Sequence, residues 1–170
     1  KIAEELGIEK MTEVANEMGI NGSFSIGDIP LKDGNYDVSD ATKNQLAWSG
    51  VGQYTDLVNP MQMAIICSGI ANGGKPVLPY LIGSDEGILT KLGITTGGGT
   101  GSRMMESDVA HRIGEMMRNN VENYYGDGNF PAGMEVAAKT GTGEITKSSD
   151  GSGSDKNNAW IVGYCQNEKY

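Results

Sequence analysis

Histidine, cysteine and positive charge are scarce in this sequence, and each scarcity excludes a class of site. The 170 residues include one histidine and two cysteines, with no pair at ligand spacing, so we do not expect a metal site. Lysine and arginine number 13 against 22 aspartates and glutamates, a net charge of −9, which argues against a nucleic-acid-binding surface. No apolar run approaches the ~20 residues that span a bilayer, and the first ten residues do not form a signal peptide.

The rare residues themselves are predicted to be structural. Cys67 falls in an apolar helical pattern and Cys165 in a strand-like one, so both are interpreted as small buried hydrophobic residues rather than as a disulfide. His111 is interpreted as an ordinary surface or boundary histidine. Trp48 and Trp160 are predicted to pack within the protein rather than to form platforms for a ligand.

Glycine is the abundant residue, with 26 of 170 positions, and it marks the ends of the predicted helices. Residues 2–18 contain two short helical patterns, separated near Gly7 and closed by Gly19. Asn59 and Pro60 form a helix start, and residues 61–71 then form a helix that is apolar on nearly every face and ends at a glycine pair. We expect this helix to be buried at the centre of the fold.

Ser107 is predicted to cap another helix. The apolar residues at helical spacing on one face of it are Val109, Ile113, Met116, Met117 and Val121. Three other stretches are predicted not to be helical. Residues 20–47 read as a long irregular connection, residues 75–82 as an extended edge or surface segment, and residues 95–102 (TTGGGTGS) as a mobile surface loop.

The last third of the chain predicts a β-hairpin. Residues 135–145 and 159–165 are strand-like, and a polar tract over 146–158 joins them. The expected fold is α/β of the α+β type, an antiparallel sheet flanked by helices, with this hairpin at the edge of the sheet. The outer side of residues 159–165 is expected to lack a partner strand, which would favour pairing with another copy.

The first strand of this hairpin ends in Lys139-Thr140-Gly141-Thr142, called the KTGT segment below. It combines a cation, two hydroxyl groups and a residue without a side chain, which suits a small anionic substrate lying along a strand edge. Because the chain is acidic overall, Lys139 would be the main local attractor for an anion.

Three segments together carry a resemblance to a known family: VAAKTGTGEI, NNAWIVGYCQ and SGVGQYTDLVNPMQMAIICSGIANGGKPVLPYLI. In this order and spacing they resemble the C-terminal half of a penicillin-binding protein transpeptidase domain, of the serine acyl-transferase superfamily that includes class A and class D β-lactamases. The resemblance covers residues 1–170 and implies a partial transpeptidase fold. It also implies peptidoglycan cross-linking at the extracytoplasmic face of a bacterial cell membrane, with D-Ala-D-Ala stem peptides and β-lactams as ligands and no cofactor.

Of the family motifs S-x-x-K, S-x-N and K-T-G, this chain contains the third. No lysine has a serine three residues before it, no asparagine has a serine two residues before it, and Thr42-Lys43-Asn44 is the nearest match. The resemblance therefore implies that the nucleophile belongs to a missing upstream part of the same protein. Relatives also continue beyond the last strand, so we expect residues 1–170 to be a portion of one domain, truncated at both ends and inactive alone.

The resemblance also implies a role for each residue of the KTGT segment. The backbone N–H of Thr142 would be one oxyanion-hole donor, and the hydroxyls of Thr140 and Thr142 would bind the substrate carboxylate. Lys139 would supply positive potential and contact the S-x-N serine, and Gly141 would let the substrate approach. On an ideal strand Lys139 and Thr140 face opposite sides, so either the edge twists or bulges or Thr142 carries most of the carboxylate binding.

Gly52 and Gln53 are candidates for shaping the same cleft, with a simple packing turn as the alternative. Two other functions stay open at this point: a β-lactam sensor and a non-catalytic structural relative. Within the enzymes, a transpeptidase and a D,D-carboxypeptidase share K-T-G. A nucleotide-binding loop beginning at Gly141 is not favoured, because Thr146 replaces its second required glycine and no apolar helix follows.

Overall fold

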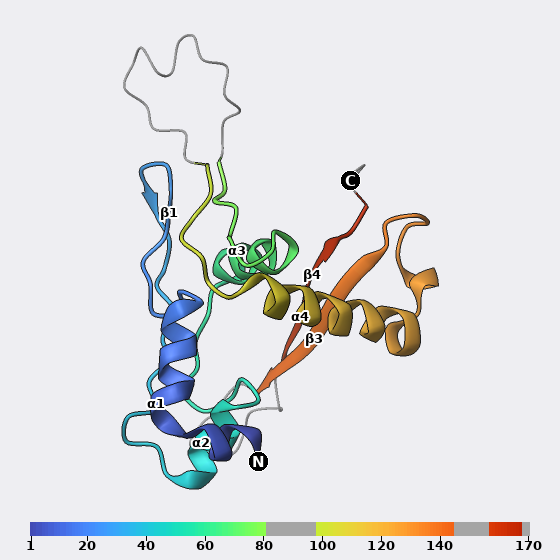
Figure 1. Cartoon of the computed structure of the whole chain (residues 1–170). Coiled ribbons are helices and arrows are strands. Elements are labelled where there is room, and N and C mark those ends of the chain that lie inside the picture. The colour runs from blue at the N-terminus through green and yellow to red at the C-terminus, as the bar shows by residue number, and fades with distance from the viewer. Residues whose placement is uncertain (81–97, 145–156, 168–170) are drawn as a thin grey trace.

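The computed structural model describes residues 1–80, 98–144 and 157–167 (Figure 1). Its helices are α1 (Ile2–Glu17), α2 (Lys43–Ser49), α3 (Pro60–Ala71) and α4 (Ser107–Asn120), followed by a π-helical turn η2 (Val121–Tyr125) and a 3-10 turn η3 (Asp127–Asn129). Its strands are β1 (Ser25–Ile26), β2 (Ile29–Pro30), β3 (Val136–Glu144) and β4 (Asn157–Cys165). No helix among these residues is long and apolar enough to cross a membrane.

The described elements form a mixed fold of helices and two small antiparallel sheets, β1-β2 and β3-β4. In Figure 1, α1 and α2 lie on one side of the molecule and the long β3-β4 hairpin on the other, with α3 and α4 between them. The main core cluster joins α3, α4 and β3, and its buried members are Ile65, Ile66, Cys67, Ile70, Met104, Met117 and Ala137. The predicted α+β class is confirmed.

Helix α1 contains the predicted interruption. Gly7 has φ 80° and ψ 172°, which is outside the helical region, so two short helices meet at this residue. Gly19 follows the second helix with φ 75°, a conformation that costs glycine nothing and other residues more.

The prediction of an irregular connection over residues 20–47 is wrong in two places. The short hairpin β1-β2 interrupts it, and α2 begins at its end. Thr42 caps α2 by a capping box: its hydroxyl accepts from the Gln45 backbone N–H, and the Gln45 side chain accepts from the Thr42 backbone N–H at 2.8 Å. Thr-x-x-Gln is a known helix-start signal, so the sequence contained the information.

Helix α3 begins as predicted. The Asn59 side chain accepts from the Gln62 backbone N–H at 2.8 Å, and Pro60 occupies the first helical position. The helix is buried on most of its surface, with Gln62 and Ile65 almost fully enclosed. Ala64 is an exception, since it is exposed.

Helix α4 differs from its prediction at both its cap and its buried face. The N-cap is Glu106, whose side chain forms no capping hydrogen bond, and Ser107 is already helical. The predicted stripe is partly wrong, because Val109 is 44% exposed and Met116 60% exposed. The buried face instead runs along Ala110, Gly114, Met117 and Val121, the last belonging to η2.

The extended segment after α3 is confirmed in its described part, and it lies beside the glycine-rich segment. Leu78 donates its backbone N–H to the Gly99 carbonyl at 2.8 Å, and Gly101 donates to Pro76 at 2.9 Å. Residues 98–101 are therefore hydrogen-bonded to 76–79, where a mobile loop was expected. The rest of that predicted loop, residues 95–97, lies outside the described residues.

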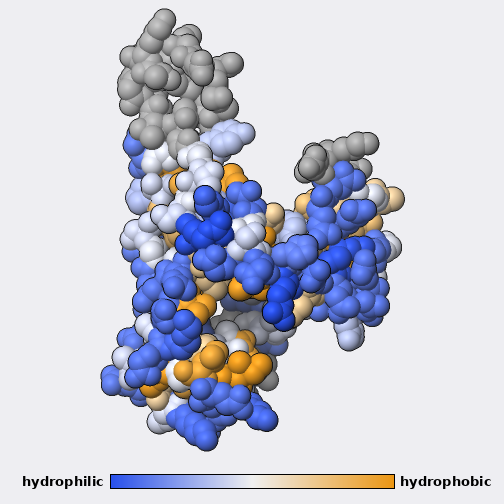
Figure 2. Space-filling model, in the orientation of Figure 1, coloured by the Kyte–Doolittle hydropathy of each residue, from blue (hydrophilic) through white to orange (hydrophobic). Residues whose placement is uncertain are grey.

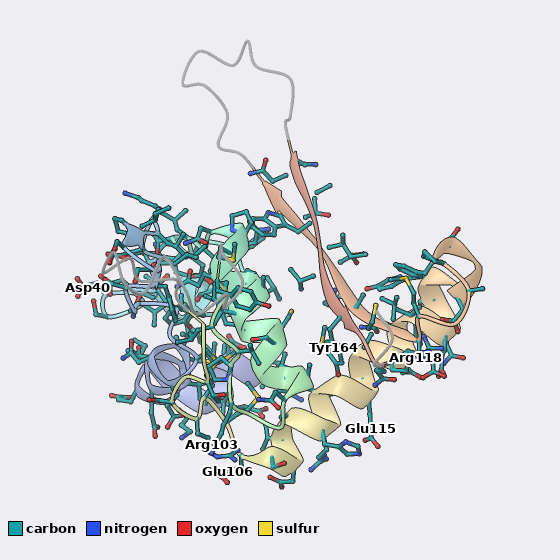
Figure 3. All side chains as sticks on the ribbon, turned by 90° about the horizontal axis from the view of Figure 1, so that it is seen from above. Asp40, Arg103, Glu106, Glu115, Arg118 and Tyr164 are labelled. Carbon is teal, nitrogen blue, oxygen red and sulfur yellow. The ribbon has the colours of Figure 1, made fainter. Side chains whose placement is uncertain are left out.

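The predicted hairpin is confirmed, with β4 beginning two residues before its predicted start. Its nine residue pairs run without interruption from Val136 opposite Cys165 to Glu144 opposite Asn157. The polar connection lies outside the described residues, apart from Asn157 and Asn158 at the start of β4. In Figure 3 the hairpin crosses beside α3 and α4, and Tyr164 lies between β4 and α4.

Both cysteines are free; Cys67 is buried as predicted, whereas Cys165 is only half-buried. His111 is at the surface as predicted, with its Nε2 atom 3.3 Å from a Glu115 carboxylate oxygen. Trp160 is half-buried, but Trp48 is 55% exposed, so its predicted packing role is wrong. Figure 2 shows hydrophobic surface at the end of the molecule formed by α1 and α2, and the large exposed hydrophobic residues of these helices and of the turn after α2 include Ile2, Leu6, Trp48 and Val51.

Candidate functional site

The KTGT segment lies in β3, and Lys139, Thr140, Gly141 and Thr142 are all exposed. The register is continuous through the segment, so the predicted possibility of a bulge is not realised. By strand alternation, Thr140 and Thr142 share one face, while Lys139 and Gly141 share the other face with Ala137 of the core.

Side chains bind the backbone of β3 along the edge opposite β4, called the free edge below. Four carbonyls of alternate residues accept these hydrogen bonds: Val136 from Arg118 at 2.9 Å, Ala138 from Asn120 at 3.3 Å, Thr140 from Lys139 at 2.6 Å and Thr142 from Gln53 at 2.8 Å. Because the carbonyl and N–H of one residue in an antiparallel strand point to the same side, the even-numbered residues of β3 present both groups to the free edge.

The backbone N–H of Thr142 consequently points to the free edge, away from β4. The N–H of Thr140, two residues earlier, does the same and donates to the Tyr125 hydroxyl at 3.1 Å. The Thr142 carbonyl accepts a hydrogen bond from Gln53, which fixes the orientation of Thr142. Its N–H, by contrast, stays available within the described residues.

Lys139 and Thr140 meet at this edge without any distortion of the strand. Although their side chains leave β3 on opposite faces, the long Lys139 side chain turns toward the edge, and its Nζ atom donates to the Thr140 carbonyl. A cationic group and the two threonine residues therefore lie within one short stretch of edge.

Gln53 reaches the KTGT segment from a turn after α2. Gly52 has φ 79°, a conformation that favours glycine, and an added Cβ at Gly50 would lie 2.5 Å from the Ala3 side chain. The Gln53 N–H donates to the Trp48 carbonyl at 3.1 Å, which holds the turn closed. Of the two predicted cleft-shaping residues, the structure brings Gln53 to the KTGT segment, and Gly52 supplies the turn.

A hydrogen-bonded polar pair, Ser49 and the half-buried Asp56, anchors the same turn. The hydroxyl of Ser49, which is 4% exposed, lies 3.0 Å from each carboxylate oxygen of Asp56. Burial raises the pKa of Asp56 to about 6, and the hydrogen bond from Ser49 opposes part of that rise. Sequence reasoning did not single out either residue, because neither belongs to a recognisable motif.

Tyr125 is a further residue that sequence reasoning missed. It ends η2, where the Gly126 N–H donates to the Val121 carbonyl, and its hydroxyl lies 3.0 Å from the Thr140 hydroxyl. The hydrogen bonds with Thr140 lower the pKa of Tyr125, and the nearby Lys139 charge lowers it further. The only sequence signal was a pair of tyrosines after a helical pattern, which does not indicate a strand 15 residues later.

The first of the four β3 carbonyls at the free edge, that of Val136, is bound by a charged cluster centred on Arg118 of α4. The Arg118 guanidinium donates to both oxygens of the Asp127 carboxylate at 2.6 Å and approaches Glu122 at 3.1 Å, besides holding the Val136 carbonyl. Figure 3 shows Arg118 beside the end of the hairpin. The arginine lowers the pKa of Asp127, and together these contacts fix η2 and η3 against β3.

A cavity between described residues lies away from the KTGT segment. It has a volume of about 690 Å³ and lies between α3 and β4, lined by Pro60, Ala64, Cys67 and the β4 residues 157–163. None of its lining residues belongs to the KTGT segment. No group of three or more metal-ligating side chains gathers in the described ranges.

Comparison with known proteins identifies the family of this chain. Residues 1–170 match the family profile described as "Penicillin binding protein transpeptidase domain". The chain belongs to this transpeptidase family. A curated member, peptidoglycan D,D-transpeptidase PbpA of Mycobacterium tuberculosis, is 34% identical over 99 residues, which is 58% of this chain and 20% of that protein. The matched stretch therefore corresponds to about a fifth of that relative's length.

Solved transpeptidase structures have the same fold. The crystal structure of PBPA from Mycobacterium tuberculosis aligns with a TM-score of 0.75 at 23% identity, covering 97% of this chain and 36% of that one. Its imipenem acyl-enzyme complex aligns with a TM-score of 0.75 at 22% identity and the same coverage. The D,D-transpeptidase domain of a peptidoglycan glycosyltransferase from Eggerthella lenta gives a TM-score of 0.71 at 21% identity, covering 97% and 42%.

Proposed function

We propose that these residues form part of a penicillin-binding D,D-transpeptidase that cross-links peptidoglycan stem peptides by serine acyl transfer. In this proposal the KTGT segment binds the substrate, and the nucleophile comes from a part of the protein outside the 170 residues, because they contain no S-x-x-K. Stem peptides ending in D-Ala-D-Ala and β-lactams would be its ligands. The site of action would be the extracytoplasmic face of the bacterial cell membrane.

The observation that carries this proposal is the direction of the Thr142 N–H. An oxyanion hole needs donors that are fixed before the reaction and free of other partners. The carbonyl of Thr142 is held by Gln53, while its N–H faces the free edge. This N–H would donate to the oxygen of the substrate carbonyl as negative charge develops there during attack by the serine. Loss of one such donor typically lowers the rate by ~10²–10³-fold.

The substrate carboxylate would bind at the same edge. Thr140 and Thr142 offer their hydroxyls from one face, and the Lys139 ammonium lies at the same edge, where it donates to the Thr140 carbonyl. In a chain of net charge −9, this local cation would attract the carboxylate. Attack of the serine on the D-Ala-D-Ala amide would form an ester and release the terminal D-alanine, and the acceptor amine of a second stem peptide would then take the acyl group and free the serine.

Gly141 gives a direct test, because nothing in the described chain requires a glycine there. Its φ is not positive, and an added Cβ would meet only the Trp160 Cβ atom, at the ordinary contact distance of 3.5 Å. Gly143 is a matched control, since an added Cβ there would lie 3.8 Å or more from its neighbours. Gly141→Ala in the full-length protein should reduce acylation by a fluorescent penicillin at least tenfold, by obstructing the ligand, whereas Gly143→Ala should not.

The fold of both variants should remain intact, as judged by circular dichroism and thermal unfolding. Equal acylation of Gly141→Ala and wild type would refute the placement of the ligand along this strand. The 170-residue chain alone should form no penicillin adduct, and the adduct of the full-length protein should disappear when the serine of its S-x-x-K motif is changed to alanine. A full-length protein that acylates but does not cross-link stem peptides would favour the β-lactam sensor, and one that does neither would favour a structural relative.

A further inference from the structure

We propose that Tyr125 is a positioning residue that orients the Thr140 hydroxyl, so that its proton is directed to the carboxylate of the ligand. This inference rests on the proposed function, because it concerns the same ligand. It assigns a role to a residue that lies outside the KTGT segment and outside every motif in the sequence.

Thr140 is held at each of its polar groups. Its N–H donates to the Tyr125 hydroxyl oxygen at 3.1 Å, its carbonyl accepts from Lys139 at 2.6 Å, and its hydroxyl lies 3.0 Å from the Tyr125 hydroxyl. One phenol group thus contacts both the backbone and the side chain of Thr140. Rotation of the Thr140 side chain would break the contact between the two hydroxyls.

The hydrogen-bond inventory of the phenol determines which hydroxyl donates. A tyrosine hydroxyl has one proton and two lone pairs, and the Thr140 N–H occupies one lone pair. A phenol is more acidic than an aliphatic alcohol and is therefore the better donor. Tyr125 then donates to the Thr140 oxygen, and the Thr140 proton must point elsewhere.

That proton is directed to the free edge, where an anion would lie. In the reverse arrangement Thr140 would donate to Tyr125 and would present lone pairs, not a proton, to a carboxylate. The contact with Tyr125 therefore fixes the Thr140 hydroxyl, which would otherwise rotate freely, as a hydrogen-bond donor before the ligand arrives. This reduces the entropy cost of ordering the hydroxyl on binding. The positive charge of Lys139 at the same edge also favours an anion at this position.

The backbone around Tyr125 is fixed firmly enough for this role. Asn129 donates its side-chain amide to the Tyr125 carbonyl at 2.5 Å, and the Gly126 N–H closes the π-turn onto Val121 at 2.8 Å. Arg118 holds the following turn through Asp127. A π-turn at the end of an α-helix shifts the direction of the next side chain, and such turns are frequent at functional sites.

The test uses Tyr125→Phe in the full-length protein, with Tyr124→Phe as the matched control. Phenylalanine keeps the ring and removes only the hydroxyl, and Tyr124 is 77% exposed and forms no hydrogen bond with the described residues. Acylation rates are measured with a penicillin and with its methyl ester, which lacks the charged carboxylate. The quantity of interest is the ratio of the two rates, because a general loss of stability would lower both.

For wild type and Tyr124→Phe we expect a strong preference for the free carboxylate. Tyr125→Phe should reduce that preference about tenfold, the effect of one lost hydrogen bond to a charged group, while acylation by the ester stays close to wild type. Thr140→Val should reduce the preference similarly, and the double variant should lose little more, because both changes remove one interaction.

The outcomes separate this inference from the proposed function. If the wild type forms no adduct with either compound, the proposed function fails. If the wild type prefers the carboxylate and Tyr125→Phe retains that preference, the role of Tyr125 is refuted and the function stands. If Tyr125→Phe does not fold, Thr140→Val decides: retention of the carboxylate preference by Thr140→Val would refute the role of the hydroxyl that Tyr125 is inferred to orient.

Discussion

Replacing Asp56 by asparagine should make the protein more stable at neutral pH and leave it unchanged in acid. The pKa of this carboxyl is raised from 3.8 to about 6 by burial, so the native state holds its proton more tightly than the unfolded chain. Stability from this group is therefore fully present below pH 4, declines as pH rises to about 6, and is lost above that. An asparagine is never ionised, and its side-chain oxygen can still accept the hydrogen bond from Ser49.

The size of the effect follows from the same shift. A change from 3.8 to about 6 corresponds to about 3 kcal/mol for a group shielded from water. Asp56 is only partly buried and solvent screens its charge, so we expect Asp56→Asn to be more stable by about 1 kcal/mol above pH 7. Near pH 4 the difference should be close to zero.

The measurement is urea denaturation, followed by tryptophan fluorescence, at several pH values between 4 and 8. Only the difference between wild type and variant is interpreted, because other carboxyls have the opposite dependence; hydrogen bonds with Ser39, for example, lower the pKa of Asp37. Asp40→Asn is the control, since Asp40 is exposed and forms no hydrogen bond or ion pair within the described residues. The reasoning would be refuted if the difference in free energy of unfolding between variant and wild type were constant with pH. It would also be refuted if the variant were less stable, relative to wild type, at pH 7.5 than at pH 4.

Two further predictions concern packing and the thiols. Gly163→Ala would place its methyl group 2.5 Å from the Ala137 carbonyl oxygen and should destabilise the protein by about 1–3 kcal/mol in urea denaturation. Gly143→Ala is the control and should not destabilise the protein, because its methyl group would lie 3.8 Å or more from its neighbours. Equal effects of the two changes would contradict this packing. Cys165 should react with iodoacetamide before Cys67, because Cys67 is buried and burial raises its pKa. Mass spectrometry that finds Cys67 labelled first would contradict this order.

Elements with local signals were predicted well from sequence. Asn59 and Pro60 specify the start of α3 through groups only three residues apart, and Gly7 interrupts α1 by its own backbone preference. The capping box at Thr42 is equally local, but the short helix that it starts was missed. The hairpin was predicted because two strand-like segments flank a polar tract.

The errors in α4 have a different cause. Helical spacing places Val109 and Met116 on an apolar stripe, but the surface that meets the sheet is the one with small residues. Gly114 permits this approach, because an added Cβ would lie 2.4 Å from the Tyr164 hydroxyl. Close packing therefore selected the face that can come nearest to the strands, and apolar periodicity alone does not contain that information.

Some residues of the candidate site could be predicted from sequence and others could not. The KTGT residues were found from their chemistry, and the resemblance suggested their roles. Gln53 was a candidate without a known contact, and Tyr125 was missed, because their hydrogen bonds to Thr142 and Thr140 depend on how distant elements pack. A sequence pattern identifies the groups that a ligand would meet more easily than the groups that hold them in position.

The hydrogen bond between Gln53 and Thr142 also sets an order of events during folding. The two residues lie 89 positions apart, and closing so long a loop costs more entropy than pairing β3 with β4 across their short connection. Contacts between distant residues form slowly, so we expect the hairpin to form first and the Gln53 contact later. A newly made chain would then expose its KTGT strand before Thr142 is fixed, and under the proposed function the competence to bind a ligand would arrive only with the last long-range contacts.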